Sequence, residues 1–131
     1  ITKIEQLSDY VDEVPEIAWD LVEFAADPLT VIYPKGKNVS PSLLGTDGSI
    51  AIRLVKDEFC KGLIYRYQRA IVSTSANLSG DPSPLNFASI APSIVSGVDG
   101  ILKNPAGDGP AKKASKIVQL GLHGDYKLIR G

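Results

Sequence analysis

The chain has 131 residues, of which 44% are apolar and 22% charged, and its formal net charge is −1. These values favour one ordinary globular domain with a real core, and they give no global attraction to nucleic acid. No apolar run approaches the roughly 18 residues of a membrane span, and no secretory signal is recognisable. The single cysteine, Cys60, excludes an internal disulfide and favours a cytoplasmic protein, in which this thiol is expected to be buried.

The first elements follow from apolar spacing and proline positions. Ile4, Leu7 and Val11 are spaced for one helical face and predict a short helix. A second helix is expected to begin near Pro15 and to end before Pro28. Its predicted apolar side consists of Ile17, Leu21, Phe24 and Ala25. Residues 29–34, LTVIYP, are β-branched and aromatic, and they predict a strand.

The rest of the chain mixes strands and helices without strict alternation. A long turn-rich loop is expected at residues 34–48, helices at 57–67 and at 87–95 with an interruption at Pro92, and strands at 49–55, 70–73 and 100–102. Residues 115–120 and 125–131 predict a closing hairpin around the turn GLHGD. The expected fold class is α/β, bordering on α+β: an open mixed sheet flanked by helices, with some antiparallel pairing.

Several common catalytic and binding motifs are missing from the sequence. It has no P-loop, no dinucleotide-binding glycine fingerprint and no metal-spaced cysteine pair. The only histidine, His123, lies between glycines and predicts a surface turn residue, which makes a Ser–His–Asp hydrolase improbable. The residues by themselves identify no catalytic group and no metal site.

Residues 73–77, STSAN, form the richest polar segment. Their hydroxyls and amide can donate and accept hydrogen bonds, and small side chains let a ligand approach backbone N–H groups. After a predicted buried strand, such a loop suits a phosphate, a ribose or a carboxylate. The alternative is a capping turn in which the same side chains satisfy free backbone groups. Composition leaves the two interpretations evenly balanced.

Arg53 lies on the polar side of an otherwise apolar strand. Its guanidinium could pair with a carboxylate or phosphate, or it could simply face solvent. Thr30, at a strand start, and the basic cluster of Lys112, Lys113 and Lys116 have the same ambiguity between ligand binding and an ordinary exposed role.

Five segments, in this order and spacing, resemble the YrdC-like family, whose best-known members are the threonylcarbamoyl-adenylate synthases of tRNA modification. They are PLTVIYP, SIAIRL, IVSTSANLSG, SKIVQL and YKLIRG. The family's S-T-S-A-N-x-S-G segment is highly specific, and residues 73–80 match it throughout. The further matches are Pro28 to Thr30 for P-L-T, Ile52 and Arg53 for the V-R strand, Ser115, Ile117 and Val118 for S-T-[IV]-V, and Leu128 to Arg130 for the L-[IL]-R ending. The resemblance covers the chain from about Pro15 to its end.

The resemblance implies an enzyme that joins L-threonine, bicarbonate and ATP into threonylcarbamoyl-adenylate and releases pyrophosphate. Such phosphoryl chemistry needs positioning and charge neutralisation more than a covalent nucleophile. The ATP-binding residues it implies are Ser73, Thr74, Ser75, Asn77 and Arg130, and the threonine-binding residues are Thr30, Arg53 and Ser115. Mg²⁺ would be held mainly by the triphosphate, with no metal ligand from the chain.

The sequence also departs from the family pattern. Ala26 and Asp27 replace a usual P-G, so a negative charge is expected near the site, and Lys116 replaces a usual threonine. The family's N-terminal K-x-R segment is not recognisable, so residues 1–131 are interpreted as one YrdC-like domain comprising its C-terminal two-thirds. On that interpretation the chain alone should be weak or inactive, and an exposed sheet edge would favour a homo-oligomer.

An alternative of another class is a YrdC-like module that binds nucleotide or double-stranded RNA without synthesis. A concave basic surface would favour this binder, whereas a threonine-sized pocket beside Arg53 would favour the enzyme. The expected macromolecular partners are tRNA or double-stranded RNA and proteins of the t6A pathway. A carbamoyl-transfer domain of hydrogenase maturation is disfavoured, because no acylphosphatase-like or zinc-binding segment accompanies the match.

Overall fold

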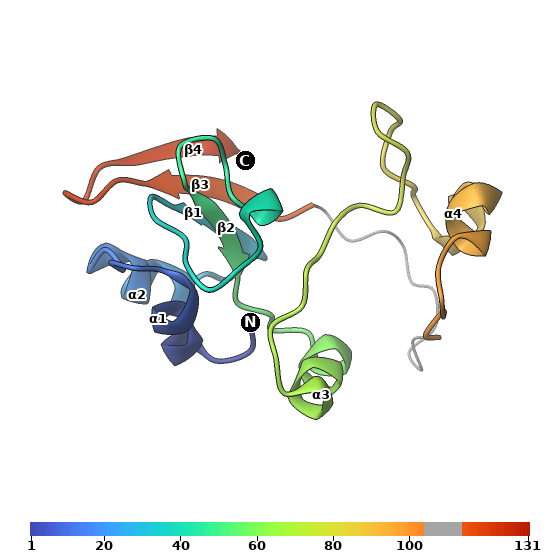
Figure 1. Cartoon of the computed structure of the whole chain (residues 1–131), viewed down its shortest axis with the longest axis horizontal. Coiled ribbons are helices and arrows are strands. Elements are labelled where there is room, and N and C mark those ends of the chain that lie inside the picture. Colours follow the sequence, from blue (N-terminus) through green and yellow to red (C-terminus); the bar gives the residue numbers. More distant parts are fainter. Residues whose placement is uncertain (104–113) are drawn as a thin grey trace. The chain divides into compact units, whose positions relative to one another are not determined.

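A computed structural model describes residues 1–103 and 114–131 (Figure 1). The chain divides into two compact units, one formed by Ile1–Ile71 with Ala114–Gly131 and one by Val72–Lys113. The elements in chain order are η1 (Ile4–Gln6), α1 (Leu7–Tyr10), α2 (Ile17–Glu23), β1 (Leu29–Tyr33), η2 (Pro41–Leu43), β2 (Ile50–Arg53), α3 (Glu58–Tyr67), η3 (Phe87–Ser89), α4 (Pro92–Ser96), β3 (Lys116–Leu120) and β4 (Tyr126–Arg130).

The first unit contains a four-stranded sheet in the order β2-β1-β3-β4. β1 pairs antiparallel with β2 and parallel with β3, and β3 pairs antiparallel with β4. The mixed sheet with helices confirms the predicted fold class, and the closing hairpin lies where the sequence predicts it. A β-bulge interrupts the β3–β4 ladder, since Ile117 pairs with Arg130 whereas Val118 pairs with Leu128.

One face of this sheet carries the core. Apolar side chains of the strands meet α1 and α2, which lie together on that side of the sheet (Figure 1). The fully or nearly fully buried members are Ile1, Leu7, Val11, Ala18, Val22, Val31, Tyr33, Ile50, Val118 and Leu120. Because successive strand residues face opposite sides, the residues between them point to the other, more open face.

The apolar side of α2 differs from the prediction. Ala18 and Val22 are buried, whereas Ile17 and Phe24 are 42% and 77% exposed. α2 has only seven residues, and its buried positions, Ala18 and Val22, are four apart. Leu21, which was predicted on the apolar side, and Trp19 are partly buried against the core, so the prediction holds for Leu21 but not for Ile17 and Phe24.

The segment between β1 and β2, expected to be a long loop, has structure of its own. It contains η2, and Gly36 forms an isolated bridge with Val11 while its nitrogen donates to the Gly48 carbonyl at 2.9 Å. A side chain at Gly36 would collide with Leu44 and Ile50, so the backbone approach there requires glycine. The segment therefore packs onto the first unit.

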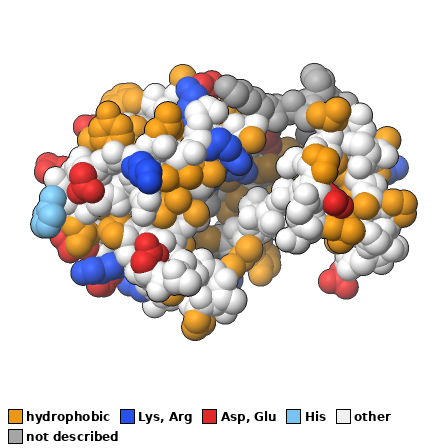
Figure 2. All heavy atoms as spheres, turned by 90° about the horizontal axis from the view of Figure 1, so that it is seen from above, with side chains coloured by type: hydrophobic (Ala, Val, Ile, Leu, Met, Phe, Trp, Pro, Cys, Tyr) orange, Lys and Arg blue, Asp and Glu red, His pale blue; other side chains and the backbone are white. Residues whose placement is uncertain are grey.

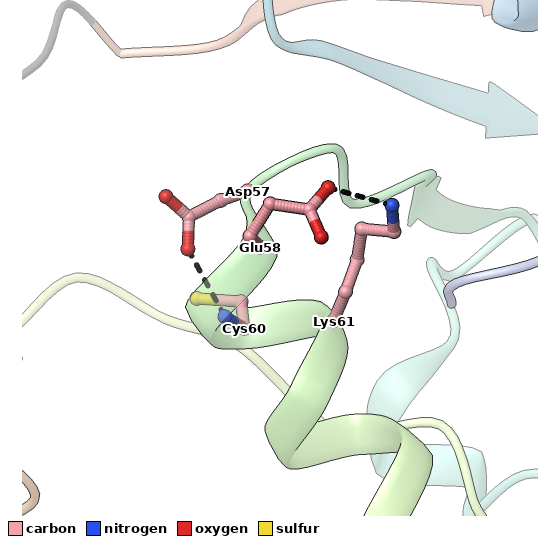
Figure 3. Close-up of polar contacts among 4 residues, drawn as sticks. All are labelled: Asp57, Glu58, Cys60 and Lys61. Carbon is pink, nitrogen blue, oxygen red and sulfur yellow. Dashed lines mark hydrogen bonds and ion pairs between the residues drawn. The ribbon is translucent and has the colours of Figure 1, made fainter.

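α3 begins with a regular cap (Figure 3). The Asp57 side chain accepts a hydrogen bond from the Cys60 backbone nitrogen at 3.0 Å, and the Lys61 ammonium pairs with Glu58 at 2.8 Å. The helix matches the predicted one, but Cys60 is half-buried rather than buried. The side chain of Ile64 is the buried contact of this helix.

Two predicted strands are wrong. Residues 70–73 and 100–102 are not in a ladder, and Ile71, Val72 and Leu102 are 41%, 69% and 65% exposed. β-branched residues favour an extended backbone, but a strand also needs a neighbouring strand for its N–H and C=O groups. Within the described part of the chain, the sheet ladders join other segments.

In the second unit, the predicted helix at 87–95 is confirmed as two short pieces, η3 and α4, separated at Ala91. Pro92 opens α4, where its missing N–H costs nothing. Among residues 72–103 no large hydrophobic side chain is buried, and those most exposed include Val72, Leu78, Leu85 and Leu102. The described part of this unit therefore has no apolar core of its own.

Hydrophobic side chains also reach the surface in the view of Figure 2, next to both positive and negative side chains. The two charge signs are mixed over that face. In residues 1–103 and 114–131, none of the helices is long and apolar enough to cross a membrane.

Tyr33 provides a test of the core. Its side chain is fully buried, its hydroxyl has no hydrogen-bond partner among the described residues, and burial raises its pKa above the usual range. An unpaired buried hydroxyl costs free energy, so Tyr33→Phe should leave the free energy of unfolding unchanged or raise it by up to about 1 kcal/mol. Tyr33→Ala, which leaves a cavity, should lower it by about 3–5 kcal/mol. Urea unfolding measures both, and a large loss in Tyr33→Phe would show that the hydroxyl has a stabilising partner.

Candidate functional site

Four residues form a row across the sheet at one end. Thr30 of β1 pairs with Arg53 of β2 and with Ile117 of β3, and Ile117 pairs with Arg130 of β4. Directly opposed residues of neighbouring strands lie on the same face, which here is the open face away from α1 and α2. Two arginines therefore lie at the two edges of the sheet, with a threonine between them.

The centre of this row is a direct polar contact. The Thr30 and Ser115 hydroxyl oxygens are 2.9 Å apart, although the residues are 85 positions apart in the chain. The Arg130 guanidinium donates to the Ser115 carbonyl from Nε at 3.0 Å and from Nη2 at 2.7 Å. Nη2 also donates to the Ser115 hydroxyl at 3.3 Å. Thr30, Ser115 and Arg130, all predicted as site residues, are thus brought together.

The local chain determines why these groups meet. Ser115 immediately precedes β3, and it is the buried polar residue of this cluster, at 9% exposure. Parallel pairing of β1 and β3 brings the starts of both strands to one edge, so the hydroxyls of Thr30 and Ser115 become neighbours. The bulge in β4 places Arg130 opposite Ile117, from where its side chain can reach Ser115.

Arg53 extends the row on the other side of Thr30. It lies opposite Thr30 and is exposed, so the structure brings its backbone beside Thr30 without burying the guanidinium. The Ile1 nitrogen donates to the Arg53 carbonyl at 3.1 Å. Burial, and then the Arg53 charge, lower the pKa of this amino group. An exposed guanidinium on the same sheet face as a hydroxyl is suited to a carboxylate or phosphate.

The predicted ATP-binding loop lies in the second unit. Ser73, Thr74 and Ser75 are exposed, and they do not follow a buried strand as expected. The Asn77 amide nitrogen donates to the carbonyls of Leu78 and Asp81, both at 2.9 Å. This amide therefore ties its own turn, as the capping alternative predicts. Because the two units are separate bodies, the approach of this loop to Arg53 and Arg130 stays a prediction.

The exposed hydroxyls still leave the loop able to bind a ligand. The Asn77 Oδ1 atom is buried and has no hydrogen-bond partner among the described residues. Gly80 has a φ of +91°, so the turn that follows requires a residue without a Cβ. The segment is thus a turn in which the side chains of Ser73, Thr74 and Ser75 are exposed.

Two hollows of the first unit lie away from the row. One of about 610 Å³ is lined by the first residues of the chain together with Glu23 and Leu54. The other, of about 340 Å³, lies on the α2 side, where Phe24, Asp27, Leu29 and Lys116 contribute to its lining. Neither hollow is lined by Arg53, Thr30, Ile117 or Arg130, so the expected threonine-sized pocket beside Arg53 is not one of these two.

Two lysines near the row, Lys116 and Lys56, make contacts that were not predicted. The Lys116 ammonium lies 2.8 Å from an Asp27 carboxylate oxygen, and the Lys56 ammonium donates to the carbonyls of Glu23 and Ala25. The negative charge of Asp27 indicated that a basic partner was needed. Lys116 could be identified as that partner only from the register of β1 and β3. The other two lysines of the predicted basic cluster, Lys112 and Lys113, lie outside the described residues.

The remaining predictions concern His123 and metal ligands. His123 is exposed in the β3–β4 turn, as predicted. In the described ranges, no three or more His, Cys, Asp or Glu side chains are grouped so that they could hold a metal ion. The donors of the row, guanidinium and hydroxyl groups, favour an anion rather than a cation.

Comparison with protein families places this geometry in context. The family model Sua5_yciO_yrdC, described as "Telomere recombination", matches residues 1–131. A relative named threonylcarbamoyl-AMP synthase, from Pyrococcus abyssi, is 36% identical over 92 residues, which cover 70% of this chain and 27% of the relative. A protein of the same name from Idiomarina loihiensis is 30% identical over 105 residues, covering 78% of this chain and 56% of the relative.

Two solved structures have the same fold. One is a double variant of Sua5 from P. abyssi, with a TM-score of 0.73 and 30% identity. The other is P. abyssi Sua5 complexed with L-threonine, with a TM-score of 0.72 and 29% identity. Each match covers 92% of this chain and 35% of the other. The chain therefore spans between about a quarter and about half of the length of these relatives.

The Thr30–Ser115–Arg130 contact can be tested by stability. Ser115→Ala removes a hydroxyl from two partners but leaves the carbonyl that holds Arg130, so the free energy of unfolding should fall by about 0.5–1.5 kcal/mol. Ser42→Ala is the matched control, because it removes a hydroxyl pair with Ser40 at 2.8 Å that is exposed to water. Its effect should stay within about 0.5 kcal/mol. Equal effects in urea unfolding would contradict a special role for the buried contact.

Proposed function

Because this chain belongs to the Sua5/YciO/YrdC family, we propose that its protein is a synthase of threonylcarbamoyl-adenylate. The substrates would be L-threonine, bicarbonate and ATP, and pyrophosphate would be released. The observation that carries this proposal is the row that places Arg53, Thr30 and Arg130 on one sheet face, with Ser115 in contact with Thr30 and Arg130. The relatives named for this activity, and the Sua5 neighbour that binds L-threonine, support the same proposal.

The chemistry of the row suits an amino acid with a side-chain hydroxyl. An exposed guanidinium can form two parallel hydrogen bonds to a carboxylate, and Arg53 has this freedom. The Thr30 hydroxyl, held by Ser115, can donate to or accept from a polar group of the same ligand. We therefore assign the threonine carboxylate to Arg53, and neighbouring polar groups to Thr30 and Ser115.

Arg130 has a different role. Its Nε and Nη2 groups are used by the Ser115 carbonyl, which fixes the plane of the guanidinium. The remaining donors of a fixed guanidinium can face negative charge that develops during phosphoryl transfer. We assign them to the phosphates of ATP. By resemblance to the family, the hydroxyls of Ser73, Thr74 and Ser75 and the Asn77 amide are likewise proposed as ATP ligands.

The reaction needs no nucleophilic side chain. Threonine and bicarbonate would form a carbamate with loss of water, and a carbamate oxygen would attack the α-phosphorus of ATP. The bond from that phosphorus to the bridging oxygen would break, and pyrophosphate would leave. Holding both reactants in line, in a site that neutralises charge, supplies most of the acceleration in such reactions.

Magnesium would act as a companion of the nucleotide. The donors of the row are cationic or hydroxyl groups, which do not suit a hard divalent cation, so phosphate oxygens would supply its ligands. When bound, the ion would neutralise phosphate charge. The chain's part is then to hold the threonine and one side of the phosphates.

The activity itself is tested by exchange of labelled pyrophosphate into ATP. Exchange that requires both L-threonine and bicarbonate would support the proposal, and it should be measured on this chain and on its protein at full length. Because the chain spans only part of its relatives, we propose that it is weak or inactive by itself. Exchange at the same rate in both proteins would contradict that expectation.

Two substitutions separate the two ligands. Arg53→Ala should weaken L-threonine binding by about tenfold, because a charged hydrogen-bonding partner is lost, and ATP binding should change less. Asn77→Ala should release the 73–80 turn and weaken ATP binding by about three- to tenfold, with threonine affected less. Calorimetric titration of the full-length protein measures both affinities.

Arg69→Ala is the control for the first substitution, since it removes an exposed arginine outside the row. Its threonine affinity should equal that of the parent protein. If Arg53→Ala and Asn77→Ala lower stability but change neither affinity, both side chains have only structural roles.

A second function, RNA binding, is favoured by the end of α3. Tyr65 and Tyr67 are 67% and 59% exposed, and Arg66 and Arg69 lie beside them. Exposed aromatic and guanidinium groups together can stack on bases and contact phosphates. The partners suggested by this surface are tRNA or double-stranded RNA. Partner proteins of the t6A pathway and self-association of the chain are separate expectations.

If this surface binds RNA, the double variant Arg66→Ala/Arg69→Ala should bind tRNA about tenfold more weakly than the parent protein. The affinity of the double variant should also depend less on salt concentration. A filter-binding titration at two salt concentrations measures this effect. Lys127→Ala, an exposed lysine on β4, serves as a control for the loss of positive charge. Equal weakening in the control and the double variant would leave only a general electrostatic effect and contradict the surface proposed on α3.

A further inference from the structure

The connection from α2 to β1, residues 24–28, is held by two lysines. Lys56, three residues after β2, donates from its ammonium to the carbonyls of Glu23 at 2.9 Å and Ala25 at 2.6 Å. Lys116, the first residue of β3, pairs through its ammonium with Asp27 at 2.8 Å. Since β2 and β3 are the two neighbours of β1, the connection is fastened from both sides.

The Asp27–Lys116 ion pair lies where the pairing of β1 and β3 begins. The Lys116 backbone nitrogen donates to the Pro28 carbonyl at 2.9 Å, and Leu29 pairs with Lys116 in the parallel ladder. Side chain and backbone of the same lysine thus hold two successive residues of the connection. Both contacts fix where β1 starts relative to β3.

That register determines the centre of the proposed site. Thr30 follows Leu29, and Ser115 precedes Lys116, so their hydroxyls meet at 2.9 Å only while the two strand starts stay aligned. Arg130 is fixed in turn by the Ser115 carbonyl. A change in alignment at Lys116 would therefore reach Thr30, Ser115 and Arg130 together.

The ion pair and the site lie on opposite sides of the sheet. Lys116 contributes with Val118 and Phe24 to the lining of the hollow of about 340 Å³ near α2, whereas Thr30 and Ile117 face the other way. The pair can therefore act on the site through the strands, without touching a ligand. The pairing with Lys116 also offsets the charge of Asp27, which was expected to oppose an anion.

We propose that Asp27 and Lys116 are positioning residues for the threonine site, an inference that rests on the proposed function. Their side chains are 66% and 46% exposed, and exposed ion pairs add little to global stability. The effect is therefore expected in strand alignment and in ligand affinity.

The test uses neutral substitutions of similar size and a reversed pair. Lys116→Gln and Asp27→Asn are made as single substitutions. Each should speed hydrogen exchange at the backbone amide of residue 116 by about three- to fivefold, and each should weaken L-threonine binding by a similar factor. The protein that carries Asp27→Lys and Lys116→Asp together should regain most of both properties. Exchange is read by NMR on this chain, and affinity by calorimetry on the full-length protein.

Lys61→Gln is the matched control, because it breaks the Glu58–Lys61 pair of the same 2.8 Å length on α3 (Figure 3). It should change neither measurement. The proposal is overturned if Lys116→Gln leaves both measurements at parental values, or if the reversed pair behaves like the single variants. If exchange follows the expected order while the parent protein binds no threonine, the positioning role stands and the proposed function fails.

Discussion

The parallel pairing of β1 with β3 is the constraint on which the first unit depends. It joins Leu29–Tyr33 to Lys116–Leu120, segments separated by most of the chain, and it supplies the two central strands of the sheet. The core packs against one face of these strands, while the polar row crosses the other. Closing so long a loop costs conformational entropy, which the buried contacts of Val31, Tyr33 and Val118 offset.

Much of this unit could be predicted from local patterns. Alternation of apolar and polar residues predicted β2, and β-branched or aromatic residues bounded by prolines predicted β1. Both signals lie within single segments of the sequence. The same signals failed at residues 70–73 and 100–102, since an extended backbone becomes a strand only when a partner is present. The buried side of α2 was predicted only in part, since Leu21 packs against the core but Ile17 is exposed, because two turns of helix leave the choice of face to tertiary packing.

The site shows the same division. Motif resemblance identified Thr30, Arg53, Ser115 and Arg130 as separate positions, and residue type indicated an anionic ligand. Their mutual contacts needed the register of three strand pairs, which no single segment encodes. Asp27 and Lys116 were noticed as departures, yet their pairing depends on that same register. The hydroxyl loop at 73–77 remains the part whose spatial relation to the row is a proposal.

The bulge in β4 has a consequence for how such a site can change over evolution. With regular alternation from Leu128, Ile129 would lie opposite Ile117, and Arg130 would point toward the helices. One additional residue in the strand instead delivers a guanidinium to the open face. Deletion of Ile129 would remove the bulge and leave the arginine opposite Ile117, whereas pairing of the same residues without a bulge would put an aliphatic side chain there. At this edge of the sheet, the way in which the strand pairs determines the charge on the open face as much as the identity of its residues.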